Sequence, residues 1–201
     1  MGRLLALYLR SRHVPIAVPA AIVATAVLAV LGDNPQNPLE TVDFAVLALA
    51  LGFSVVGNGF AGADETLERT ASIRWPVWRT AHALIVSALL FGAVALVSHA
   101  PVGLVLRDAT GLAGLATLAA ALFGAQLSWT LPIVWAGVAA MVPPVPAEPL
   151  LALITWPAQQ PGNAGAAVVA VVLGVVGVVS YAVGGTHQSW TVPSVRRFTG
   201  R

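Results

Sequence analysis

The chain has 201 residues, of which 58% are hydrophobic and only 9% are charged, whereas roughly 25% of the residues of a soluble domain are charged. It has no cysteine, which excludes disulfides, thiolate metal ligands and a cysteine nucleophile, and no lysine, which excludes a lysine-dependent phosphate loop and a Schiff-base enzyme. We interpret the net charge of +2 as a sign of membrane topology rather than of nucleic-acid binding. The composition predicts an all-α integral membrane protein with a single transmembrane domain.

The first 32 residues combine a basic start with an apolar run. Residues 1–13 carry arginines among leucines and predict a short interfacial helix. Residues 14–32 contain no charged residue and predict the first span, since a helix needs about 20 apolar residues to cross the bilayer. The alternative for residues 1–32 is a cleaved signal peptide, for which the apolar run is long.

Five further apolar stretches complete a prediction of six spans. The fourth and fifth form a hairpin within a charge-free run, with the turn predicted at residues 126–132, and the fifth is short. The proline-rich residues 143–163 cannot form one continuous helix and predict a re-entrant or interfacial helical element on the outer face. The predicted spans after the first are 44–63, 80–98, 111–127, 131–142 and 164–184.

The arginines orient this topology. With six spans both termini lie on the same side as nine of the ten arginines, and that side is therefore predicted to be the cytoplasm. Only Arg107 falls on the other side, and five spans would instead place the C-terminal arginines outside. The nine are Arg3, Arg10, Arg12, Arg69, Arg74, Arg79, Arg196, Arg197 and Arg201.

The predicted cores of the spans contain no Asp, Glu or Arg, which argues against an ion-coupled transporter. His82 and His99 fall near opposite ends of the third span, and we interpret both as structural. Asn58 lies among glycines and suggests either close helix packing or a contact on a substrate path at a loosened helix end. Trp135 lies within the fifth span and suggests either packing or a side chain that faces a substrate.

Aromatic and small residues give two further predictions. Five tryptophans are expected to anchor the chain at the membrane surfaces, with Trp156 near the outer one. The last span carries small residues at helical spacing, which predicts a helix–helix seam within one chain or between two. These small residues are Gly174, Gly177, Ser180 and Gly184.

The most charged part of the chain lies between the second and third spans. Its acidic residues precede its arginines, which suits both ends of a helix dipole, and Glu65 and Arg69 have the favourable i,i+4 order. Pro76 fits the first turn of the next span, with Trp75 and Trp78 at the membrane surface. Residues 64–76 therefore predict a short surface helix that contacts a soluble partner; the alternative is a solvated loop.

This layout resembles that of the membrane subunits of type-2 ATP-binding-cassette exporters. Those subunits have six spans, an interfacial N-terminal helix and an outward helical insertion between the last two spans. A coupling helix joins their second and third spans. Its sequence is often an acidic residue followed by E-R-x-x-G-T, with a proline before the third span. Here "LERTA" at residues 67–71 stands in that place, followed by Pro76 and Arg79, and Ala71 and Ser72 replace the usual Gly-Thr.

The resemblance implies a permease without catalytic residues. Two such subunits, identical or related, would pair with two ATP-binding-cassette subunits, which would bind ATP and Mg²⁺, and this chain would hold no cofactor or metal. The expected cargo is hydrophobic or amphipathic, and the expected location is the bacterial cytoplasmic membrane. Two alternatives remain open: a membrane anchor that recruits a soluble partner, and an autonomous channel or secondary transporter. The implied ATPase contacts are Glu65, Glu68, Arg69, Arg74 and Trp75.

Overall fold

A computed structural model describes residues 14–60, 75–142 and 149–186 of the chain. Within these three ranges the protein is all-α, with seven α-helices, three 3-10 turns and no strand. Five of the helices are long and apolar enough to cross a membrane by length and composition. The chain is therefore a multi-pass helical membrane protein, as its composition predicts.

The helices fall into two length classes. The five long ones have 18 to 23 residues, and the two short ones, α7 and α8, have 12 and six. Three 3-10 turns extend or join them: η1 (Gly57–Phe60), η2 (Ala125–Leu127) and η3 (Trp156–Ala158). The helices are α2 (Val14–Leu31), α3 (Pro38–Val56), α5 (Trp75–Val97), α6 (Val102–Phe123), α7 (Thr130–Met141), α8 (Pro149–Ile154) and α9 (Ala164–Gly184).

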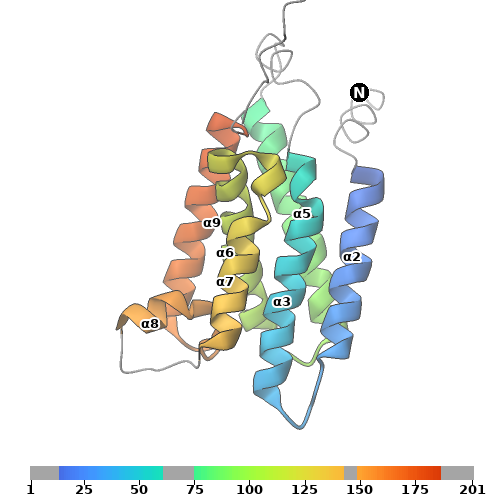
Figure 1. The fold of residues 1–201 in the computed structure, drawn as a ribbon, viewed down its shortest axis with the longest axis vertical. Coiled ribbons are helices and arrows are strands. Elements are labelled where there is room, and N and C mark those ends of the chain that lie inside the picture. The colour runs from blue at the N-terminus through green and yellow to red at the C-terminus, as the bar shows by residue number, and fades with distance from the viewer. Residues whose placement is uncertain (1–13, 61–74, 143–148, 187–201) are drawn as a thin grey trace, which may run out of the picture.

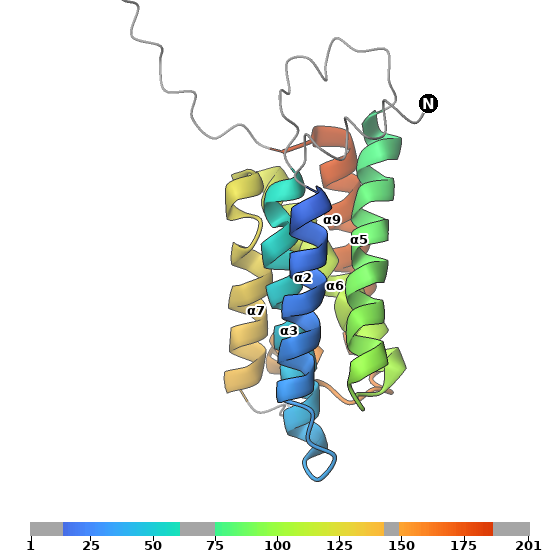
Figure 2. The same cartoon turned by 90° about the vertical axis from the view of Figure 1, so that its right-hand side faces the viewer.

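The helices α2, α3, α5, α6, α7 and α9 lie side by side and alternate in direction, while α8 lies across one end of the bundle (Figures 1 and 2). The start of α2, the end of η1, the start of α5 and the end of α9 meet at one end, which we call the proximal end. The loops at 32–37 and 98–101 lie at the other end, which we call the distal end. Although Ala125–Met141 is shorter than a typical span, it returns the chain from the proximal to the distal end.

The closest helix pair in the bundle is α6 with α9. A Cβ atom added to Gly177 would overlap the backbone carbonyl of Gly114, and one added to Gly114 would overlap the backbone of Leu173 and Gly174. The two backbones therefore touch directly, as small residues allow in membrane helices. The predicted seam is confirmed for Gly174 and Gly177, and it lies within one chain.

Three of the predicted spans begin at least five residues too late, and the second and fourth show the largest differences. The second begins at Pro38 rather than 44, because the Asn37 side chain accepts a hydrogen bond from the Glu40 backbone N–H and caps the helix. Glu40 in the first turn also suits the helix dipole. The fourth begins at Val102 rather than 111, so its first turns include charged residues that the prediction placed outside.

The other boundaries agree more closely with the sequence. The helices α2, α7 and α9 match the residues predicted for the first, fifth and sixth spans within one residue, although α7 is too short to count among the five long helices. The third predicted span begins at Trp75, five residues earlier than predicted. The turn after α6 begins at Gly124, whose φ of 90° favours glycine. Pro132 lies in the first turn of α7, where proline is tolerated, and not in the hairpin turn that precedes this helix.

The described part of the predicted outer insertion contains α8 and η3 at the distal end. Trp156 of η3 is wrongly predicted as an interfacial anchor, because its side chain is fully buried. Its ring occupies the space that Gly111 leaves open on α6, where an added Cβ would overlap the indole. The insertion is therefore packed into the bundle at this point. The predicted interfacial helix at 1–13 lies outside the described residues.

Candidate functional site

A buried aromatic cluster lies at the proximal end, and two of its three members come before and after residues 61–74 in the sequence. The Tyr181 hydroxyl on α9 donates to the Phe60 carbonyl at the end of η1, at 2.8 Å. The two rings also meet edge to face, with centroids 5.2 Å apart, and the His82 ring of α5 meets that of Phe60 in the same way at 6.0 Å. The cluster therefore ties together the ends of α3–η1, α5 and α9.

Arg79 adds a second link between α5 and α9. Its side chain is only 8% exposed, and its guanidinium lies so close to Gly185 that an added Cβ would be 2.9 Å from both Nη atoms. Gly185 has φ 73°, a conformation that favours glycine, and it directly follows the end of α9. The carbonyl end of a helix attracts a cation, so this position suits an arginine. Arg79 thus belongs to the buried proximal end of α5.

The predicted ATPase contacts fall mostly outside the described residues. Glu65, Glu68, Arg69 and Arg74 lie there, so the coupling helix at 64–76 and their role in it stay predictions. Trp75 is the first residue of α5 and is half-buried. Pro76 follows in the first turn, as predicted.

Asn58 and Trp135, the two candidates for a substrate path, lie on different elements, η1 and α7. Asn58 is exposed in the 3-10 turn η1, which matches a loosened helix end rather than an amide packed between helices. Trp135 on α7 donates its indole N–H to the Ile154 carbonyl at the end of α8, at 2.8 Å. That bond gives Trp135 a structural role. A contact of either residue with a substrate stays a prediction.

A buried ion pair lies in the early turns of α6, before the predicted fourth span of 111–127, so the absence of Asp, Glu and Arg that was predicted for the span cores does not extend to the whole helix. Arg107 and Asp108 are 8% and 0% exposed, and the Arg107 Nε donates to the Asp108 Oδ1 at 2.8 Å. The Nη atoms of Arg107 donate to the carbonyls of Pro157, Gln159 and Gln160, at 2.8, 3.1 and 3.2 Å. The pair therefore fixes the α8–α9 connection to α6. The adjacent opposite charges are the sequence signal that could have revealed it.

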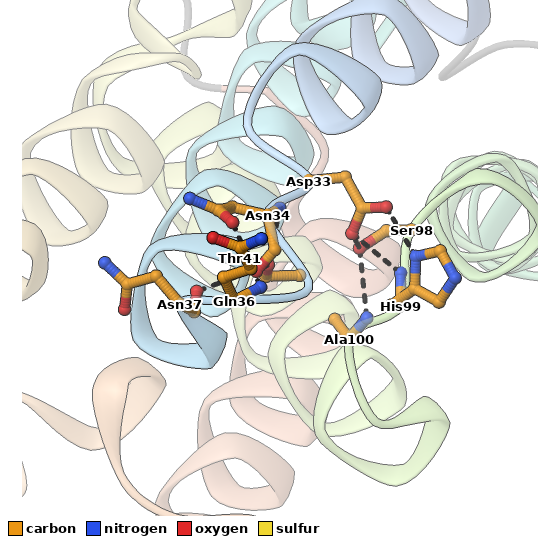
Figure 3. A network of polar contacts seen from close by, with 8 residues as sticks. All are labelled: Asp33, Asn34, Gln36, Asn37, Thr41, Ser98, His99 and Ala100. Atoms are coloured by element: carbon orange, nitrogen blue, oxygen red, sulfur yellow. Dashed lines mark hydrogen bonds and ion pairs between the residues drawn. The ribbon is translucent and has the colours of Figure 1, made fainter.

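A polar network joins two loops at the distal end (Figure 3). Asp33, after α2, accepts the backbone N–H of His99 at 2.9 Å, and its second carboxylate oxygen lies 2.6 Å from the His99 Nδ1. On the other side of the same loop, Asn34 and Thr41 exchange two hydrogen bonds, at 2.9 and 3.0 Å. The loop at 32–37 is thus fastened both to α3 and to the loop that follows α5.

This network predicts an acid-sensitive contribution to stability. The backbone N–H of His99, followed by its ring, lowers the pKa of Asp33 below its ordinary value of 3.8. A lowered carboxyl pKa stabilises the folded state above pH 3.8, and this contribution is lost as the pH falls through the folded-state pKa. We expect Asp33→Asn to lose less thermal stability than the wild type on acidification below pH 3.8, measured by circular dichroism in detergent. An unchanged acid response would contradict this assignment.

Comparison with protein-family models finds no match, and comparisons with curated proteins and with solved structures find none either. In the described parts of the chain, no group of three or more His, Asp or Glu side chains could hold a metal ion. The contacts that stand out join helix ends to one another.

Proposed function

We propose that this chain is the membrane subunit of an ATP-driven exporter, which moves a hydrophobic or amphipathic molecule outward with energy from a separate ATP-binding subunit. The supporting observation is the aromatic cluster of Phe60, His82 and Tyr181, which links η1 and α5, the elements before and after residues 61–74 in the sequence, to α9. A soluble partner that displaced this segment would act on α3, α5 and α9 together. Such a linkage is what a coupling helix requires.

The proposed topology has six crossings with the proximal end in the cytoplasm of a bacterial cell. The alternating helix directions support an even number of crossings when the short Ala125–Met141 element is counted. A short crossing is compatible with local thinning of the bilayer. Of the arginines in the described residues, Arg79 lies at the proximal end and Arg107 toward the distal end.

In this proposal the predicted surface helix meets the ATPase. Glu65, Glu68, Arg69, Arg74 and Trp75 form the contact, and ATP and Mg²⁺ bind to the partner subunit. A second copy or a related permease subunit completes the complex in the membrane. Cargo would cross between the two permease subunits, with Asn58 and Trp135 as candidate contacts on its path.

Co-purification tests the proposal. We would tag the chain, extract it gently from its native membrane and identify its stoichiometric partners. We expect an ATP-binding subunit, and we expect the double charge reversal Glu68→Arg and Arg69→Glu to remove it, since opposed charges set the register of such contacts. The matched control is Gln36→Arg, which adds a charge to an exposed distal position and should retain the partner.

Other outcomes would replace the proposal. A stoichiometric partner without an ATP-binding domain would indicate a membrane anchor or assembly protein. A stable homo-oligomer without partners would indicate a channel or secondary transporter. The contacts of Arg107 argue against the last of these, because its guanidinium already binds Asp108 and three backbone carbonyls.

A further inference from the structure

A pocket of about 880 Å³ opens at the distal end of the bundle. Its walls come from three separate parts of the chain: residues 34–42, residues 99–104 and residues 158–163. Its volume lies in the range of roughly 300–1,000 Å³ that is usual for small-molecule sites. Of the predicted site residues that the structure describes, Asn58, Trp75 and Trp135, none lines the pocket, so the sequence did not point to it.

The contacts described above hold all three walls in place. The hydrogen bonds from His99 to Asp33 join the first wall to the second. The bonds from Arg107 to the carbonyls of Gln159 and Gln160 join the third wall to α6. The pocket is therefore formed before any ligand arrives, which lowers the entropic cost of binding.

The lining combines apolar and hydrogen-bonding groups without a charged carboxylate or guanidinium. Leu39, Val42 and Leu104 provide aliphatic surface. The polar part consists chiefly of side-chain amides, with the Thr41 hydroxyl and the His99 imidazole. The amides belong to Asn34, Gln159, Gln160 and Asn163.

The charged groups behind the walls are already occupied. Asp33 binds His99, and Arg107 binds Asp108 and backbone carbonyls. Glu40 accepts the Asn34 side-chain amide at 2.9 Å. Among the described residues, the lining supplies no carboxylate or guanidinium that could pair with an ionic group on a ligand, so such a group gains no ion pair there.

We propose that the distal pocket binds an uncharged amphipathic ligand, one that presents amide groups to the side-chain amides and an aliphatic group to Leu39, Val42 and Leu104. The identification of this ligand as cargo rests on the proposed export function. The existence of the binding site does not, because the pocket is complete within this one chain.

A charge series of dipeptides tests the ligand class. The neutral probe is N-acetyl-leucyl-leucinamide, the anion is N-acetyl-leucyl-leucine and the permanent cation is N,N,N-trimethyl-leucyl-leucinamide. Binding to the purified chain in lipid nanodiscs is measured at pH 8 by saturation-transfer NMR, with empty nanodiscs subtracted. We expect the neutral probe to bind, and we expect the affinity of both charged probes to be lower by at least about tenfold.

A pair of glycine substitutions tests the location. Gly162 lines the pocket, and a Cβ atom added there meets no atom within 4 Å, so Gly162→Trp fills the pocket without a backbone clash. Gly103 lies at the same end, also has no atom within 4 Å of an added Cβ, and does not line the pocket. We expect Gly162→Trp to abolish binding of the neutral probe and Gly103→Trp to retain it, with unchanged circular dichroism in both.

The two results decide the inference. Binding of the anion or the cation as tight as that of the neutral probe would overturn the ligand class. Equal behaviour of the two tryptophan variants would show that the probe enters lipid or another site, and would overturn the location. Because no ATPase is present, these results stand apart from the co-purification outcome, which tests export itself.

Discussion

Gly177→Ala is expected to destabilise the protein by about 1–3 kcal/mol, or to prevent its folding, although it adds only one methyl group. That methyl would overlap the backbone carbonyl of Gly114, which no change of rotamer can move. The α6 and α9 backbones must therefore separate, and the close contact along the seam is lost. Thermal unfolding of the purified chain in detergent, followed by circular dichroism, measures the effect.

Gly92→Ala provides the matched control for this change. Gly92 also lies inside a long helix, α5, but an added Cβ there meets no atom within 4 Å. Alanine is the better helix former by about 0.5–1 kcal/mol, so we expect this variant to unfold at the same temperature or a higher one. If both variants unfolded at the same temperature, the seam would not be the close contact that the structure shows.

Removal of the Arg107 side chain is the second change with a large expected effect. Arg107→Ala leaves three carbonyls without their donor and the Asp108 carboxylate buried without its cation. Such a loss typically costs about 3–5 kcal/mol. We expect a much lower unfolding temperature, and early proteolysis in the α8–α9 connection that Arg107 holds to α6.

The double variant Arg107→Leu with Asp108→Leu separates the two causes. It removes the buried charges together, so the penalty for an unpaired carboxylate disappears and only the lost carbonyl bonds remain. We expect its stability to lie between that of the wild type and that of Arg107→Ala. A double variant less stable than the single one would contradict the role of Asp108 as a charge that requires a partner.

The positions of the helices follow well from the sequence, because long apolar runs have few alternatives in a bilayer. The sixth predicted span matches α9 residue for residue, and the first matches α2 within one residue. The predicted break at 126–132 is also close, since α6 ends at Phe123 and α7 begins at Thr130. In each case the length of the apolar run and the turn residues beside it determine where the helix begins and ends.

Tertiary contacts explain the failures. The start of α6 was misplaced because charge usually marks the end of a span, whereas here Arg107 is neutralised by Asp108 and by carbonyls some 50 positions later in the chain. Trp156 was misplaced because aromatic residues usually anchor at the interface, whereas Gly111 offers it space inside the bundle. Asp108 is adjacent in the sequence, but neither the distant carbonyls that bind Arg107 nor the glycine that makes room for Trp156 can be identified from the local pattern.

The candidate site was the least predictable part for the same reason. The bond from Tyr181 to Phe60 spans 121 positions, and neither residue stands out in the sequence. The distal pocket depends on three connections that come together only in the folded bundle. The charged segment that follows Phe60 in the sequence could be recognised, because charge is conspicuous in an apolar chain.

The packing of α6 has a consequence for the order in which the chain assembles during synthesis. Of the five long spans, α6 is the least hydrophobic and the most buried, and the groups that Arg107 binds outside α6 all follow it in the chain. When α6 leaves the ribosome, its glycine-lined face and its guanidinium therefore face lipid or the insertion machinery. The guanidinium gains its carbonyl partners only when residues 157–160 have been made, and the glycine-lined face is covered only when α9 follows. A chain that stops before residue 157 therefore leaves in the membrane a polar helix whose guanidinium lacks these carbonyls.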